Sequence, residues 1–375
     1  MDATNVPSLD DFRESVIDFL ETSIGEGVAC PAFGSIMPPA VFEPARAWQR
    51  HLFDAGFAGI HWPVAYGGRG LTLDHHHVWI EECARREVAA YMNFQGFVLA
   101  GPAILKFGTE EQKRRYLGGT LSAEIVWCQL FSEPGSGSDL VSLTTRAMAD
   151  GDGWLVTGQK VWSSTAQLAQ HGILLARTDP DDAGHGGISF FLFDMAGPGV
   201  DVRPLKQMTG DQEFCEVFLD AAPVAADDLL GPLNGGWRVA TSVLADERSA
   251  VGAAGIGLER RTAALLEQIA DHGTVERDRV VDIAVSAGAT RRLLDRSAGD
   301  PFLGPLVKLA MTEFESTRTR AVVDLLGPAG AGEGEAQTEF LYAPGMRVAG
   351  GTSEIQRNLI GERLLGLPRE PKPRS

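Results

Sequence analysis

The fold is decided by a stretch that reads Phe131-Ser132-Glu133-Pro134-Gly135-Ser136-Gly137-Ser138-Asp139. Its Gly, Pro and Ser residues predict a tight turn after a strand, with backbone N–H groups free to meet an anion or the polar edge of a ring system. From spacing alone an ordinary surface turn explains it better. The sequence on either side of the stretch therefore has to decide between a surface turn and a binding turn.

Helical patterns flank a β-rich middle. Apolar residues recur at three- and four-residue steps near the start of the chain, as at Leu9, Phe12 and Val16, and Thr109 and Gln112 have capping-box spacing. We expect helices at about 40–55, 73–88, 236–270, 276–296 and 302–326, and a last one from Thr352 or Ser353 to just before Pro368.

The middle region has strand-like intervals. A hairpin-type turn at 150–153 is followed by short apolar runs at 154–161, 172–176, 188–193, 200–205 and 214–219. We therefore expect an α+β multidomain protein: an N-terminal helical domain (1–120), a small β-barrel or sandwich (121–232) and a C-terminal four-helix bundle (233–375). This order excludes a doubly wound sheet. With no GxGxxG after a strand, a dinucleotide would bind in a cleft between domains.

Composition excludes several classes of protein. The formal net charge is −17 and no Lys/Arg run interleaves with aromatics, so a nucleic-acid groove is not expected. No basic leader and no apolar run of about 20 residues is present, so we expect a cytoplasmic protein without a membrane span. The four cysteines are far apart and read as free thiols in a reducing compartment. The run His75-His76-His77 lacks ligand spacing and is expected to be a solvated helix start.

Three segments in order carry a resemblance to a known family. The stretch at 131–139, a Trp-Ser-Ser at 162–164 and Gly-Gly-Thr-Ser-Glu-Ile-Gln-Arg at 350–357 together resemble the acyl-CoA dehydrogenase family of flavoproteins. The resemblance implies bound FAD, with Phe131 and Ser132 facing the isoalloxazine ring. It places Gly137 and Ser138 near the pyrophosphates of FAD and coenzyme A, so that Ser138 also binds substrate.

Trp162 and Ser164 should alternate on a strand and present an apolar wall and a hydroxyl on one face. Alone, Trp162 is more simply a core tryptophan. The resemblance implies that Trp162 covers a face of the flavin and that Ser164 lies near its reactive nitrogen N5.

Gly350-Gly351-Thr352-Ser353 opens a helix, where Ser353 and Gln356 have capping-box spacing. Free N–H groups at that end would attract a polarised oxygen, although a well-capped helix is the simpler explanation. The resemblance implies that the Gly350 N–H binds the thioester carbonyl and that Thr352 and Glu354 touch the flavin. It also implies that the turn containing Gly327 and Gly330 meets the flavin diphosphate bound mainly by a neighbouring subunit.

This chain differs from the family pattern at the position of the catalytic base. Many members carry Glu where this chain has Gly350. Glu247 is the alternative, because it lies on an apolar stripe with Ala240, Val243 and Val251 and has no Lys or Arg three or four positions away. Such a carboxylate takes up a proton more readily than a solvated one, though a Glu that reaches solvent fits the pattern equally. The resemblance favours a base here, with Arg248 holding coenzyme A.

The resemblance thus implies α,β-dehydrogenation of an acyl thioester, on coenzyme A or an acyl-carrier protein, with electrons passed to an electron-transfer flavoprotein. The family's Arg-Phe-Gly after the long helix is missing, and Arg277 or Arg279 substitutes only weakly for its arginine. A homo- or hetero-oligomer is expected. The alternatives are a non-catalytic or half-site partner subunit and a flavin oxidase or monooxygenase. The absorbance of the purified chain and the rate of flavin reoxidation by oxygen separate them.

Overall fold

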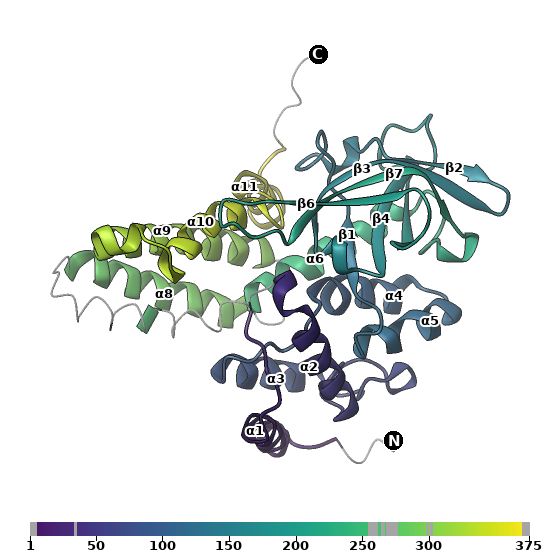
Figure 1. Ribbon diagram of the computed structural model, residues 1–375. Helices are drawn as coiled ribbons and strands as arrows, with labels where there is room; N and C mark the ends of the chain where they lie inside the picture. Colours follow the sequence, from purple (N-terminus) through teal and green to yellow (C-terminus); the bar gives the residue numbers. More distant parts are fainter. Residues whose placement is uncertain are drawn as a thin grey trace. The chain divides into compact units, whose positions relative to one another are not determined.

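The structure, a computed structural model, describes residues 6–33, 36–253, 262–263, 267, 277–297, 300 and 303–369, with the backbone alone at 246–253 and 277. Two compact units make up the chain. One comprises Met1–Gln207 with Asp211–Val243, and the other comprises Met208–Gly210 with Leu244–Ser375. In element order, helices precede and follow a run of strands, as the sequence predicts (Figure 1).

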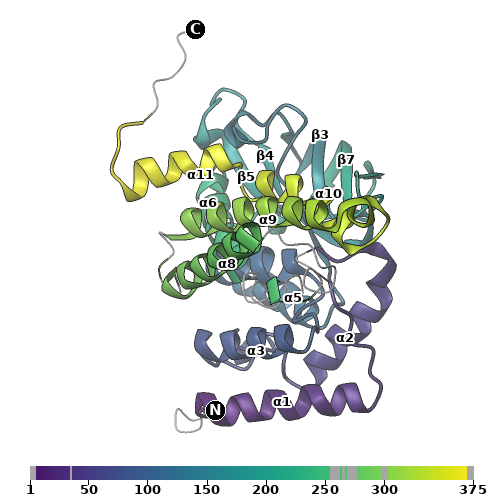
Figure 2. The same ribbon diagram turned by 90° about the vertical axis from the view of Figure 1, so that its left-hand side faces the viewer.

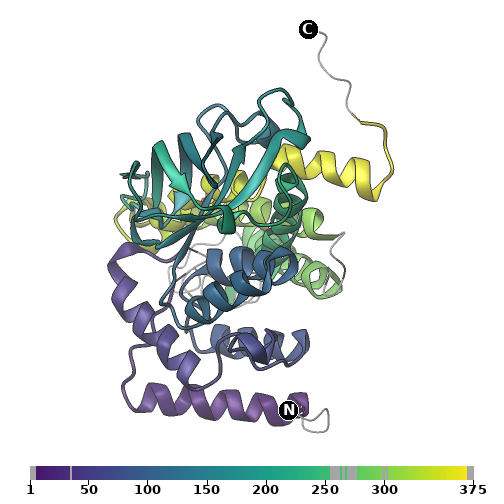
Figure 3. The same ribbon diagram turned by 90° about the vertical axis from the view of Figure 1, so that its right-hand side faces the viewer.

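The first unit begins with helices that pack through apolar faces. They are α1 (Leu9–Gly25), α2 (Phe42–Asp54), α3 (Leu73–Arg85), α4 (Gly101–Phe107) and α5 (Glu110–Leu121). The side chain of Ser8 caps α1 by accepting from the Asp11 N–H, and Phe12, Val16 and Leu20 on its inner face are buried. Figures 2 and 3 show α3 lying along α1.

A π-helical segment, η3 (Gln95–Ala100), leads directly into α4. A Cβ on Gly101 would clash with the Trp62 ring, so this helix approaches the preceding loop as only glycine permits. The capping box of α5 is confirmed, because Thr109 and Gln112 each accept from the other's backbone N–H. Gln112 Nε2 also donates to two carbonyls at residues 227 and 229, which ties α5 to the chain after the last strand.

The histidine run differs from expectation. His75 is 4% exposed and bonds Thr72 Oγ1 and the Pro7 carbonyl, so a fully solvated helix start is wrong for this residue. His76 is half-buried beside the Tyr91 hydroxyl, where burial lowers its pKa to about 3. The reason is that α1 and the loop before α4 cover this end of α3. Within the described ranges no group of three or more His, Cys, Asp or Glu could hold a metal ion.

The middle of the chain forms one seven-stranded mixed sheet. Its order is β1-β4-β2-β3-β7-β6, and β5 pairs with β4. The strands are β1 (Trp127–Leu130), β2 (Arg146–Asp150), β3 (Gly153–Ser164), β4 (His171–Arg177), β5 (Ile188–Asp194), β6 (Val200–Leu205) and β7 (Phe214–Val224). All five expected strands are present, and β1 and β2 are additional.

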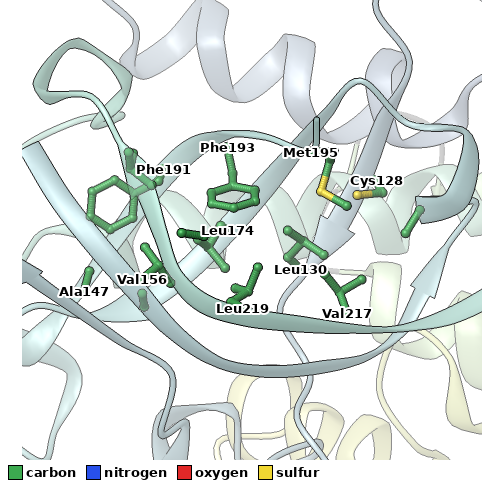
Figure 4. Packing of buried hydrophobic residues seen from close by; sticks show 14 of the residues in the cluster. Cys128, Leu130, Ala147, Val156, Leu174, Phe191, Phe193, Met195, Val217 and Leu219 are labelled. Carbon is green, nitrogen blue, oxygen red and sulfur yellow. The ribbon is translucent and has the colours of Figure 1, made fainter. Parts of the chain in front are cut away.

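The sheet carries its own apolar core (Figure 4). Alternate residues of the strands point inward and meet across the cluster, as the period of two requires. Its members include Leu130, Leu174, Phe191, Phe193, Val217 and Leu219, and all six are at most 3% exposed. Cys128 and Cys215 lie in the same cluster as free thiols. This core fixes the ends of β1 and β3, where the glycine-rich stretch and the Trp-Ser-Ser segment begin.

Helix α6 (Gly236–Ala253) crosses the boundary between the units, and the expected continuation to residue 270 lies mostly outside the described residues. The second unit contains α8 (Arg277–Ser297), α9 (Gly304–Leu326), α10 (Glu335–Val348) and α11 (Ser353–Leu359), followed by a π turn, η11 (Ile360–Leu364). Figure 1 shows α9 lying alongside both α8 and α10. The sequence did not predict α10, because Pro344 and Gly345 interrupt its helical pattern.

Arg318 links α9 to α10 through a buried ion-pair network. Its guanidinium donates to Glu315 Oε2 over 2.7 Å and to Glu339 Oε2 on α10 over 2.8 Å. Arg318 is 4% exposed, so the two carboxylates balance a charge that water cannot reach. Over the described ranges, no helix combines the length and the apolar character that crossing a membrane requires.

Candidate active site

The glycine-rich stretch forms a tight, exposed turn immediately after β1. Glu133 and Ser136 exchange two backbone hydrogen bonds of 2.9 and 3.0 Å, so the two residues between them protrude at the tip. Phe131 enters the turn from the buried side, whereas Gly137 and Ser138 are exposed. A Cβ built on Gly137 would meet nothing within 4 Å. The backbone of this turn is therefore open on one side, as the sequence predicts.

A buried ion pair supports the turn from behind. Lys160 Nζ on β3 donates to Glu133 Oε1 over 2.9 Å and to the Phe131 carbonyl oxygen over 3.0 Å. The Lys160 side chain is 0% exposed and that of Glu133 is 4% exposed. Thr144 donates to Glu133 Oε2 through its N–H and its hydroxyl, and the Thr145 N–H donates to Oε1. The carboxylate thus has a donor for every contact that water would otherwise supply.

Both members of the pair are charged at neutral pH. Burial by itself would raise the pKa of Glu133, but the Lys160 ammonium and the hydrogen bonds from residues 144 and 145 outweigh it and lower this pKa to about 2. Burial lowers the pKa of Lys160 to about 8, against the opposing effect of the Glu133 charge. The pairing of Lys160 with Glu133 is not apparent from the sequence. The available signal was Lys160 itself, a lone lysine two positions before Trp162.

Trp162 lies in a β-bulge. Strand β3 pairs with β7 in register from Gly158 to Lys160 and again from Ser163, with an irregularity between Lys160 and Ser163. Trp162 has a φ of +60° and is 60% exposed, with its ring edge-on to Phe214. The expected regular alternation between Trp162 and Ser164 is therefore interrupted, because the bulge adds one residue to β3. Re-aiming a side chain in this way is a common use of bulges beside functional sites.

The two serines after Trp162 are buried. Ser164 is 9% exposed. Ser163 is 0% exposed, and its hydroxyl has no hydrogen-bond partner among the residues that the structure describes. Ser163 is not a candidate from the sequence, because strict alternation along a strand would point it away from the face of Trp162. An unpaired buried hydroxyl is costly, so Ser163 is a further candidate contact for a ligand.

In the second unit the Gly350–Gly351 turn has φ of +66° and +94°, values that favour glycine. Gln356 Nε2 donates to the carbonyls of Gly350 and Gly351 over 2.9 and 3.2 Å, and Lys308 Nζ donates to that of Gly351 over 2.7 Å. Gln356 and Lys308 are buried. Since the C=O and N–H of a trans peptide point in opposite directions, the N–H groups of Gly351 and Thr352 face away from this buried pair.

The cap of α11 differs from expectation. Thr352 is the N-cap and its hydroxyl accepts from the Ile355 N–H, so a capping box between Ser353 and Gln356 is wrong. The Ser353 hydroxyl donates instead to Glu313 Oε1 on α9 over 2.8 Å, and the amide of Gln356 is occupied with the glycine carbonyls. Thr352 is half-buried, and Glu354 is exposed in the first turn.

The turn after α9 contains two glycines with different constraints. Gly327 has a φ of +57° and open space at its Cβ position. Gly330 is buried, and a Cβ there would lie 2.7 Å from the Val323 carbonyl oxygen. Packing alone therefore explains Gly330. Arg279 donates to Asp324 over 2.8 Å, and the side chain of Arg277 lies outside the described residues.

Glu247 and Arg248 lie on α6, and their side chains are outside the described residues. The described part of the apolar stripe is buried, since Ala240 and Val243 are each 0% exposed. Glu247 follows Val243 by four positions, one turn further along the same helix face.

Comparison with known proteins covers nearly the whole chain. Residues 7–124, 128–222 and 234–365 match the N-terminal, middle and C-terminal domains of acyl-CoA dehydrogenases. The chain belongs to the acyl-CoA dehydrogenase family. The resemblance seen in the sequence is thereby confirmed at the level of the family, whose members are FAD-dependent oxidoreductases. The predicted fold class and enzyme class are confirmed with it.

Individual relatives support the same family assignment. The chain is 36% identical to acyl-CoA dehydrogenase IpdE1 of Mycobacterium tuberculosis, over 97% of this chain and 99% of that protein. It is 40% identical to acyl-CoA dehydrogenase FadE34 of the same organism over 87% of this chain, but spans only 47% of that longer protein. Among solved structures, the Tcur3481-Tcur3483 steroid ACAD superposes with a TM-score of 0.83 at 27% identity, covering 99% of this chain and 100% of that one.

The features of the first unit fit a flavin. Trp162 offers an exposed apolar surface, the Ser163 hydroxyl is a buried polar atom that needs a partner, and the backbone at Gly137 is open to an anionic group. An apolar wall, a polar contact and an accessible backbone are what a flat ring with a phosphate tail requires.

Proposed function

We propose that this acyl-CoA dehydrogenase family member binds FAD and oxidises an acyl-CoA thioester to its trans-2-enoyl form. The observation that carries the proposal is the joined arrangement in the first unit. There the open turn at 131–138 and the bulge at Trp162 are held together by one buried lysine. The loss of two hydrogens from adjacent carbons needs a proton acceptor, a hydride acceptor and a group that polarises the carbonyl.

The chain's own residues divide this work. Glu247 takes the α-proton, and the Gly350 N–H donates to the thioester carbonyl, where negative charge develops. A backbone donor of this kind is typically worth about 3 kcal/mol of transition-state stabilisation. Arg248 and Ser138 hold the coenzyme A moiety. Bound FAD supplies the acceptor for the β-hydrogen as hydride. The residues proposed to hold it are Phe131, Ser132, Gly137, Ser138, Trp162, Ser164, Thr352 and Glu354, with Gly327 and Gly330 turned to a neighbouring subunit's cofactor.

We propose a ring-bearing acyl group, of the steroid-derived class, as the substrate. Two observations support it: the similarity to a steroid ACAD along the whole chain, and the glycine at position 350, which leaves Glu247 on the long helix as the proposed base. Electrons would then leave to an electron-transfer flavoprotein.

The test is an absorbance titration of the purified protein under nitrogen. A yellow protein whose visible flavin band bleaches with a ring-bearing acyl-CoA supports the proposal. Bleaching with straight-chain thioesters alone would overturn the substrate class. No bleaching with any acyl-CoA, by a protein that carries FAD, would overturn the reaction.

The base is tested with Glu247→Gln. This variant should keep the flavin band but lose bleaching, because an amide cannot accept the proton. Glu267→Gln makes the same chemical change at an exposed helix position and should bleach normally. Full bleaching by Glu247→Gln would reject the assignment.

A second candidate is a subunit of a mixed assembly. It is favoured by Gly350 in place of the usual glutamate and by a structural relative whose name joins two proteins, Tcur3481 and Tcur3483. The measurement is the molar mass and the FAD-to-protein ratio of the chain expressed alone. One FAD per chain in a homo-oligomer would rule this candidate out, whereas a colourless chain that gains FAD with a related partner would establish it.

A further inference from the structure

Lys160 is the buried charge that joins the two segments proposed to hold the flavin. From β3 its ammonium reaches the Phe131 carbonyl and the Glu133 carboxylate, which lie at the start of the open turn. Next to it, the Val161 N–H donates to the Ser132 carbonyl over 2.9 Å. Lys160 therefore fixes residues 131–133 against the strand just before the bulge at Trp162.

A buried ion pair is a poor way to fill a core. Desolvating two charges offsets most of their attraction, and apolar residues of similar volume often serve stability equally well. The alternative reading is that Lys160 and Glu133 merely pack the sheet. It does not account for their partners, because the pair also bonds the backbone at residue 131, where the turn begins, and at residues 144 and 145, just before β2.

We propose that Lys160, through Glu133, is a positioning residue that sets the distance between the 131–138 turn and the Trp162 bulge for flavin binding. It touches neither substrate nor the reacting atoms. The inference rests on the proposed function, since it concerns the same cofactor, but it makes a separate claim about this chain's loop geometry.

The experiment compares three variants in the full-length protein. Lys160→Met removes the charge but keeps most of the length. Glu133→Gln/Lys160→Met removes both charges and so leaves no buried ion unpaired. Lys113→Met is the matched control, because it breaks an exposed ion pair with Glu110 on α5 of the same unit. The readouts are the FAD dissociation constant, the reduction potential of the bound flavin, the thermal midpoint, and hydrogen exchange at the Val161 amide.

Lys160→Met should raise the FAD dissociation constant about tenfold or more, as expected for small misplacements of a binding element. It should also speed exchange at the Val161 amide. The double variant should recover thermal stability but not FAD affinity. If Lys160→Met does not fold, the FAD affinity of the double variant tests the positioning role of Lys160. Lys113→Met should match the wild type in every readout.

The inference is overturned if the double variant regains wild-type FAD affinity and flavin potential, since the pair would then be packing only. It is also overturned if Lys160→Met leaves FAD affinity and Val161 exchange unchanged. A wild-type protein that binds no FAD defeats the proposed function instead. In that case, unaltered Val161 exchange in the variants would separately refute the positioning of the turn.

Discussion

Lys308 Nζ donates to the carbonyl oxygen of Gly351 over 2.7 Å, from a side chain that is 1% exposed. Lys160 has the same relationship with the carbonyl oxygen of Phe131 in the other unit, over 3.0 Å. The turns at 131–138 and 350–352 are thus each supported from behind by one buried lysine. Carbonyl oxygens drawn inward leave the N–H groups of the same peptides turned outward, where a negatively charged oxygen can meet them.

Replacing Lys308 with Met should therefore destabilise the second unit. The Arg347 carbonyl oxygen would lose its lysine donor and the Gly351 carbonyl oxygen would keep only the longer bond from Gln356, at a cost of about 1–3 kcal/mol. Urea unfolding measures the change. Arg291→Met is the control, because it removes a cation from a partly exposed i,i+4 pair with Asp295 and should cost at most about 0.5 kcal/mol. Equal losses for the two variants would contradict the prediction.

Gly330→Ala should lower stability irrespective of any cofactor. The added methyl would lie 2.7 Å from the Val323 carbonyl oxygen and 2.9 Å from its Cα, and neither backbone atom can move cheaply. Overpacking of this kind costs about 1–3 kcal/mol. Gly332→Ala in the same loop would meet only one atom, at 3.4 Å, and should change the free energy of unfolding by less than about 0.5 kcal/mol. The thermal midpoints of the two variants, measured side by side, test whether only Gly330→Ala is destabilised.

Gly137→Ala should leave stability unchanged and weaken ligand binding instead. Nothing lies within 4 Å of the added methyl, so the free energy of unfolding should stay within about 0.5 kcal/mol of the wild type. The methyl occupies space beside the backbone proposed to meet the pyrophosphates, so affinity for FAD or coenzyme A should fall. Gly135→Ala has equally open surroundings at the tip of the turn and should bind as the wild type does. Isothermal titration of both variants tests the difference, and unchanged affinity for Gly137→Ala would exclude that contact.

Acid should weaken the first unit through Glu133. Its folded-state pKa of about 2 lies below its ordinary value of 4.5, so the stability it contributes is present above pH 4.5 and is lost as the pH falls toward 2. The contribution is on the order of 2–3 kcal/mol. Glu133→Gln lacks this titration, so the gap in unfolding free energy between it and the wild type should narrow over that pH range. A gap that is constant from pH 5 to pH 2.5 would show that the carboxylate does not titrate as stated.

The sequence predicted those features that depend only on residues close together in the chain. The strands at 188–193 and 200–205, the cap at Thr109 and the open turn at Gly137 all follow from period, turn chemistry and glycine placement. The family assignment came from the segments at 131–139, 162–164 and 350–357, and the comparisons confirm it.

What the sequence could not show depends on contacts between distant positions. Lys160 and Glu133 are 27 positions apart, and neither has a neighbour that marks it as half of a pair. The bulge at Trp162 follows from how β7 pairs with β3, which no single strand records. Gln356 has the right spacing for a cap, but two glycine carbonyls compete for its amide. The roles of Glu247 and Gly350 remain proposals.

The π-helical segment at Gln95–Ala100 bears on how chains of this family can differ in length. A π turn accommodates one residue more than the α turn it replaces. Deleting a single residue within this segment would wind it into ordinary α-helix, and the change would be absorbed inside one turn. An evolutionary insertion or deletion of one residue in this segment thus needs no surface loop to absorb the change in length. This holds although the segment is buried and packs beside Trp62.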